Sequence, residues 1–168
     1  KRIDFLDKSV LEKSLNFKLG QKNLLITFHP VTLESGLAKA QMGALLEALE
    51  TLNDTNLIFT LSNADAEGHE LNKMIESFVS TQSNRIAYKS LGQLKYLSCI
   101  AQVDGVIGNS SSGLIEVPSL KKGTINIGDR QRGRLIADSV IACDPECNSI
   151  LNAITKLYSV EFQSLLSN

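Results

Sequence analysis

The sequence has few cysteines, no excess of either charge and no long apolar run. Its three cysteines are too few and too irregularly spaced for a disulfide framework. The 17 Lys and Arg residues nearly balance the 18 Asp and Glu residues, which argues against a general nucleic-acid-binding protein and against a basic membrane-surface protein. No apolar run approaches the roughly 18 residues that a membrane span needs. We therefore expect neither a nucleic acid nor a membrane as a partner.

A metal site has little support in the sequence. Cys143 and Cys147 lie four positions apart, but no histidine is near them, so the pair is a weak zinc motif. Small buried side chains in a reducing cytoplasm are the favoured interpretation. We expect no metal and no other cofactor.

The first residues, KRIDFLDKSVLEK, are charged throughout and do not form a signal peptide. We therefore expect a cytoplasmic location. The sequence lacks an initiator methionine, so we expect it to be part of a longer protein. Its 168 residues suffice for one domain, residues 1–168, with a substantial hydrophobic core.

Apolar runs alternate with helical patterns along the chain. The runs predict strands, and segments with apolar residues every three or four positions predict helices. Continuous apolar strands separated by helices indicate a parallel sheet covered on both faces. The predicted fold is an α/β, Rossmann-like, doubly wound sheet in three layers. The expected strands are 23–28, 56–61, 84–88, 103–108, 124–127 and 139–143, and the expected helices are 8–16, 36–52, 66–80, 91–102, 112–122 and 145–159.

Polar loops follow four of these strands, at 27–36, 88–92, 108–113 and 128–134. In such sheets, ligands bind beyond the carboxyl ends of the strands. The loop GNSSSG suits a phosphate, because glycines let the backbone approach and the following helix N-terminus favours negative charge. The P-loop lysine and the GxGxxG pattern are both absent, so neither a P-loop nor a nicotinamide dinucleotide site is expected. The alternative is that one serine only caps the helix.

Three further side chains are candidates for the same site. Glu116 is free of any capping box, so it can accept ribose hydroxyls, or it is a solvated helix residue. The guanidinium of Arg130 suits diphosphate oxygens, or it belongs to a solvated loop. His29 follows a strand end and has a structural alternative, while His69 is expected on the surface. Pro118 is expected in the first turns of its helix, because it lacks an N–H.

Three ordered motifs, LLITFHPVTLE, GNSSSGLIEVPSL and GTINIGDRQRGR, resemble one family. They are similar to the C-terminal half of hydrolysing UDP-N-acetylglucosamine 2-epimerases of sialic acid and capsule biosynthesis. The resemblance spans about residues 5–165. It implies a GT-B arrangement, in which two Rossmann-like lobes hold a nucleotide sugar between them.

The resemblance also implies roles for individual residues in binding UDP. Ser110 and Ser111 match serines at the diphosphate, and Glu116 matches a carboxylate on the ribose. Arg130 matches an arginine near the diphosphate, and His29 matches a histidine that enters the cleft near the diphosphate and sugar. Tyr96 falls roughly where relatives place an aromatic residue near uracil.

The family reaction removes the C2 proton, expels UDP from C1 and then adds water, which gives UDP and a free C2 epimer of the N-acetylmannosamine type. By the resemblance, the carboxylates for proton transfer lie mainly on an N-terminal lobe that is absent from this chain. The chain begins near the expected start of the second lobe and stops before the segment that crosses back. The expected partners are therefore a UDP-sugar, the protein's own N-terminal lobe and further copies in a homo-oligomer.

Three alternatives remain open at this point. A non-hydrolysing 2-epimerase would keep UDP on its product, although such relatives show Ser-Gly-Gly in place of the three serines and lack the Gly-x-Arg-Gln element. A glycosyltransferase lobe would also place a glutamate on ribose and a Gly/Ser loop on the diphosphate, but the stretch HPVT disfavours it. The last alternative is a nucleotide-binding module with no catalytic parent.

Overall fold

The computed structural model describes residues 3–31, 35–63 and 65–168. Residues 32–34 of the first motif therefore lie outside the described residues. The elements, in chain order, are α1 (Lys8–Leu15), β1 (Lys22–Thr27), α2 (Ser35–Glu50), β2 (Thr55–Thr60), α3 (Ala66–Val79), β3 (Arg85–Tyr88), α4 (Gly92–Gln102), β4 (Gly105–Gly108), α5 (Ser112–Ser119), β5 (Gly123–Ile127), β6 (Val140–Cys143), α6 (Cys147–Leu157) and α7 (Val160–Ser167).

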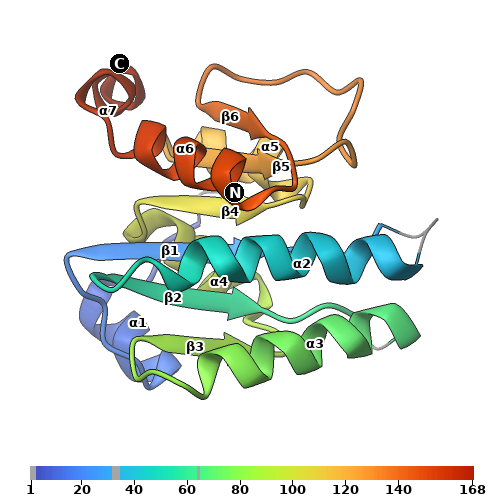
Figure 1. Cartoon of the computed structure of the whole chain (residues 1–168). Coiled ribbons are helices and arrows are strands. Elements are labelled where there is room, and N and C mark those ends of the chain that lie inside the picture. Colours follow the sequence, from blue (N-terminus) through green and yellow to red (C-terminus); the bar gives the residue numbers. More distant parts are fainter. Residues whose placement is uncertain (1–2, 32–34, 64) are drawn as a thin grey trace.

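The strands form a single six-stranded sheet in the order β3-β2-β1-β4-β5-β6. Every neighbouring pair is parallel, so all carboxyl ends meet at one edge, on the right of Figure 1. This order confirms the predicted doubly wound, Rossmann-like α/β fold. It also places β1 beside β4 in the middle of the sheet, where the chain changes direction across the sheet.

Helices cover both faces of the sheet and make three layers (Figure 1). Helices α2, α3 and α6 lie over one face, and α1, α4 and α5 lie over the other. Side chains of β1 alternate between the two cores: Leu24 and Ile26 pack with the first set of helices, whereas Leu25 packs with the second. The uninterrupted apolar run of this strand is explained by this two-sided burial.

The structure differs from the sequence prediction near the C-terminus and at Pro118. The expected helix 145–159 is α6, and a further helix that was not expected, α7, follows it, because Ser159 accepts the backbone N–H of Phe162 at 3.3 Å and caps a new helix. Pro118 lies in the last turn of α5 rather than in its first turns, so that prediction is wrong. Its missing N–H removes a helical hydrogen bond, and α5 ends at the next residue.

The three cysteines form no disulfide, and the pKa values of two of them are strongly raised. Burial raises the pKa of the Cys99 thiol to about 12, and burial with the nearby Asp144 carboxylate raises the pKa of Cys143 to about 11. Both thiols therefore stay protonated at neutral pH. Among the described residues, no group of three or more His, Cys, Asp or Glu side chains is placed to hold a metal ion.

Within the same ranges, no helix combines the length and the apolar character that crossing a bilayer requires.

Candidate ligand site at the carboxyl edge of the sheet

The candidate site lies where β1 and β4 end side by side. From β1 the chain continues to α2 on one face, and from β4 it continues to α5 on the other. Such a divergence opens a crevice between the two loops, and open α/β sheets bind ligands there.

Gly108 lets these two strand ends approach closely. Its φ is +154°, a conformation that is essentially restricted to glycine. A Cβ at this position would lie 1.7 Å from the carbonyl oxygen of Thr27. Only glycine therefore allows the loop after β4 to leave the sheet at this angle.

Asn109 joins the loops that follow β1, β4 and β5. Its side-chain Oδ1 accepts the backbone N–H of His29 at 2.7 Å, and its Nδ2 donates to the His29 carbonyl at 2.8 Å. Its own carbonyl accepts the guanidinium of Arg130 at 3.0 Å and the Nε2 of Gln131 at 2.8 Å. Asn109 itself is almost completely buried, so its own polar atoms depend on these partners rather than on water.

The serine loop presents unused donors at the start of α5. The backbone N–H groups of Ser112, Gly113 and Leu114 are bound within the loop. In the described part of the chain, no acceptor binds the backbone N–H of Ser110 or Ser111. Ser111 is the N-cap, but its hydroxyl makes no capping bond. These groups and the positive end of the helix suit an anion.

Ser112 has a different task from its neighbours. Its hydroxyl is 2.5 Å from the hydroxyl of Tyr96 on α4, so this serine joins two helices. Tyr96 also lines a cavity of about 380 Å³ that follows the ends of β2 and β3. Glu116 is exposed and lies four residues after Ser112, on the same side of α5.

Arg130 and His29 differ in their exposure. Arg130 is exposed overall, and only one of its guanidinium nitrogens is held by Asn109. His29 is partly buried, and burial together with the positive charge of Arg130 lowers the pKa of its imidazole below 6.5. The imidazole is therefore neutral at pH 7 and can either donate or accept a proton.

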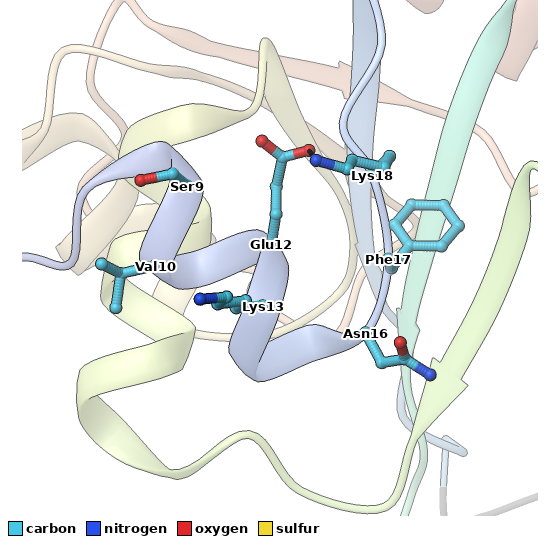
Figure 2. Close-up of a pocket in the computed structure, with 7 residues that line it drawn as sticks. All are labelled: Ser9, Val10, Glu12, Lys13, Asn16, Phe17 and Lys18. Carbon is cyan, nitrogen blue, oxygen red and sulfur yellow. Dashed lines mark ion pairs between the residues drawn. The ribbon is translucent and has the colours of Figure 1, made fainter.

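Two cavities in the described part of the chain lie apart from this site. A cavity of about 450 Å³ surrounds the end of α1 (Figure 2), where Glu12 pairs with Lys18 at 3.9 Å. The backbone of Lys18 contacts Asn56 in β2 near the start of that strand, so this cavity lies at the amino edge of the sheet. A cavity of about 460 Å³ lies at the carboxyl edge, beside α3, and is lined by His69 and Lys73 among others.

Most of the residues expected from the sequence lie at one edge. The loops of His29, Ser110, Ser111 and Arg130 follow β1, β4 and β5, and Asn109 connects them. Tyr96 contacts this group through Ser112. Glu116 lies one turn further along α5, where no hydrogen bond joins it to the other candidates within the described residues.

Asn109 and Gln131 belong to the site but were not among the residues expected from the sequence. Both are buried, although amides of this kind are more often exposed. The only available signal was their position inside the two polar loops, because their partners lie in other segments of the chain.

Comparison with known families gives a consistent result. Residues 3–167 match the family model described as UDP-N-acetylglucosamine 2-epimerase. The chain is 42% identical over 164 residues to the GDP/UDP-N,N'-diacetylbacillosamine 2-epimerase (hydrolyzing) of Campylobacter jejuni, a match that covers 97% of this chain and 42% of that protein. It is 37% identical to the polysialic acid biosynthesis protein P7 of Escherichia coli, over 94% of this chain and 41% of that protein.

Solved structures share the fold. The UDP-GlcNAc 2-epimerase of Neisseria meningitidis bound to UDP-GlcNAc superposes with a TM-score of 0.71 and 18% identity, covering 95% of this chain and 42% of that chain. The chain therefore spans about two fifths of the length of the proteins that it matches.

Proposed function

The chain belongs to the UDP-N-acetylglucosamine 2-epimerase family, and from that premise we propose that it is the UDP-binding lobe of a hydrolysing epimerase. In this proposal it is the C-terminal lobe of a longer GT-B protein that acts in the cytoplasm as a homo-oligomer. The substrate would be a UDP-acetamido sugar, and the products would be UDP and the free C2 epimer. The name of the Campylobacter relative, a hydrolysing 2-epimerase, supports this choice of reaction, and the name of the Escherichia relative supports a place in polysialic acid or related biosynthesis.

The observation that carries the proposal is the set of unused donors at the serine loop. The backbone N–H groups of Ser110 and Ser111, which no acceptor among the described residues binds, lie at the start of α5, and Arg130 is held beside them through Asn109. Backbone donors, a hydroxyl and a guanidinium together match the oxygens of a diphosphate. We assign the diphosphate to Ser110, Ser111 and Arg130.

The ribose and the uracil are assigned to residues that lie further from the serine loop. Glu116 would accept the ribose hydroxyls, because it lies one turn along α5 from the diphosphate donors. The uracil would lie against Tyr96, at the cavity beyond β2 and β3, since bases stack on aromatic side chains.

In the proposed reaction, these residues would stabilise the departing diphosphate and offer a neutral imidazole beside it. As the C1–O bond breaks, negative charge grows on the departing diphosphate, and preformed donors at Ser110, Ser111 and Arg130 would stabilise that charge. Neutral His29 would lie beside the diphosphate and sugar, where it can give or take a hydrogen bond. The base and acid at C2 are assigned to the other lobe.

Calorimetric titration of this chain with UDP, UMP and uridine tests the proposal. We expect weak binding of UDP, because half of a two-lobed cleft leaves the ligand partly solvated. Uridine should bind at least about tenfold more weakly than UDP, because each charge-assisted hydrogen bond is worth about 1.5–3 kcal/mol. The chain alone should release no N-acetylmannosamine from UDP-N-acetylglucosamine. Equal affinity for UDP and uridine, or no binding of UDP, would contradict the proposal.

The ribose role of Glu116 gives a separate prediction. Glu116→Gln should weaken UDP and uridine alike, by about tenfold to a hundredfold, because the substitution removes a charge-assisted acceptor of roughly 1.5–3 kcal/mol. Glu161→Gln, an equal loss of charge on exposed α7, should leave both affinities unchanged. If Glu116→Gln weakened UDP but not uridine, the carboxylate would act on the diphosphate and the ribose assignment would be wrong.

A further inference from the structure

Asn109 lies in the loop after β4 and is hydrogen-bonded to residues of the loops after β1 and β5. We propose that Asn109 is a positioning residue, which holds His29 and Arg130 at a fixed separation around the diphosphate. This inference rests on the proposed function for its ligand, but the contacts that carry it belong to the ligand-free protein. Asn109 itself is assigned no contact with the substrate.

The side chain of Asn109 fixes the backbone of His29 from both sides. One amide holds the N–H at 2.7 Å and the carbonyl at 2.8 Å of the same residue. A two-point pair of this kind fixes orientation as well as distance, whereas a single hydrogen bond allows rotation. His29 lies outside any strand, and Pro30 follows it. Because His29 lies beyond the end of β1, its backbone is not paired with a neighbouring strand. The side-chain amide of Asn109 binds its N–H and carbonyl instead.

The carbonyl of Asn109 fixes the other side of the site. It accepts both Arg130 and Gln131, and two donors converging on one oxygen place the loop after β5 against the loop after β4. Only one nitrogen of the Arg130 guanidinium is used in this contact, so the others remain available to an anion. Side chain and carbonyl of one buried residue thus connect His29 to Arg130.

The pKa of His29 depends on the position of this residue relative to Arg130 and to solvent. Burial and the nearby Arg130 charge lower the pKa of the imidazole. Release of the loop would expose the ring and separate it from Arg130, and both changes raise that pKa. The chain contains two histidines, so NMR can follow each ring, with His29→Gln to assign the signals and His69 as an internal reference.

Asn23 offers a closely matched control. Its Oδ1 accepts the N–H of Gly20 at 2.8 Å, and its Nδ2 donates to the Gly20 carbonyl at 3.0 Å. It is 5% exposed, compared with 1% for Asn109. Asn23 begins the apolar part of β1 at the opposite edge of the sheet. Asn23→Ala therefore removes the same kind of amide–backbone pair at a distance from the site.

The experiment compares Asn109→Ala with Asn23→Ala in the chain as it stands. Both variants should lower the urea midpoint of unfolding. Only Asn109→Ala should weaken UDP, by about tenfold or more, a loss of about 1.4 kcal/mol or more. Only Asn109→Ala should raise the pKa of His29 in the ligand-free protein. If Asn109→Ala does not fold, Asn109→Ser, which keeps a polar group but no amide, should fold and show the same two changes.

The outcomes separate this inference from the proposed function. If Asn109→Ala changes stability alone, with the His29 titration and the UDP affinity matching those of Asn23→Ala, Asn109 is structural and the inference is overturned. If the wild-type chain binds no UDP, the proposed function fails. The His29 titration in the ligand-free variants then still decides whether Asn109 positions that residue.

Discussion

Replacing Gly108 with alanine is expected to lower the free energy of unfolding by about 2–6 kcal/mol. The residue has a φ of +154°, and backbone strain of this kind costs about 1–3 kcal/mol for other residues. The new methyl group would also lie 1.7 Å from the Thr27 carbonyl oxygen, so the two central strands must separate, which costs about 1–3 kcal/mol more. Because native domains are stable by only about 5–15 kcal/mol, urea denaturation should reveal a large loss.

Gly43 supplies the control for that experiment. It lies inside α2, and, apart from its chain neighbours and the backbone of its own helix, no atom of the described residues lies within 4 Å of the place where its Cβ would be. Gly43→Ala should therefore stabilise the protein by about 0.5–1 kcal/mol, since alanine is the better helix former. A Gly108→Ala variant as stable as the wild type would show that the close approach of β1 and β4 is not tight.

Replacing Arg130 with glutamine is expected to weaken UDP by about tenfold to a hundredfold, while uridine binding stays the same. The substitution removes charge-assisted hydrogen bonds of about 1.5–3 kcal/mol to the diphosphate. It keeps a side chain that can still donate to the carbonyl of Asn109, so stability should change by less than about 1 kcal/mol. Calorimetry with both ligands measures the difference.

A variant of the neighbouring Arg132 distinguishes a direct contact of Arg130 with the diphosphate from a general effect of positive charge. Arg132 is exposed on the same loop, and Arg132→Gln removes the same charge from the protein. If the two variants weakened UDP equally, the effect of Arg130 would be long-range attraction, which salt screens, rather than a bond to the diphosphate. We expect Arg132→Gln to change UDP affinity by less than about threefold.

The fold was largely predictable because it depends on local patterns. Leu24, Leu25 and Ile26 form an uninterrupted apolar run, and the structure buries them between two layers of helices. The same alternation of strands and helices indicated which edge would carry the site. Helix α7 was not predicted, because the expected last helix, 145–159, already ended at Ser159, and the cap that this serine provides for α7 is not visible in the apolar spacing.

The contacts inside the site were less predictable because they join distant segments. No local pattern pairs Asn109 with His29, which is 80 residues away in the chain. The three serines look equivalent in sequence, yet Ser112 binds Tyr96 while Ser111 keeps its hydroxyl free of a capping bond. Side-chain partners of this kind depend on how α4 and α5 pack, which only the assembled tertiary structure determines.

The place of β1 in the sheet also bears on when the candidate site forms during folding. β1, β2 and β3 are consecutive strands in the chain and adjacent in the sheet, so this half can assemble through local crossovers that each contain one helix, α2 or α3. Pairing β1 with β4 requires closure of a loop of some 80 residues, a step that loop entropy makes slow. Because the site spans that last junction, we expect a nucleotide to bind only the finished domain. It would then slow unfolding without accelerating folding.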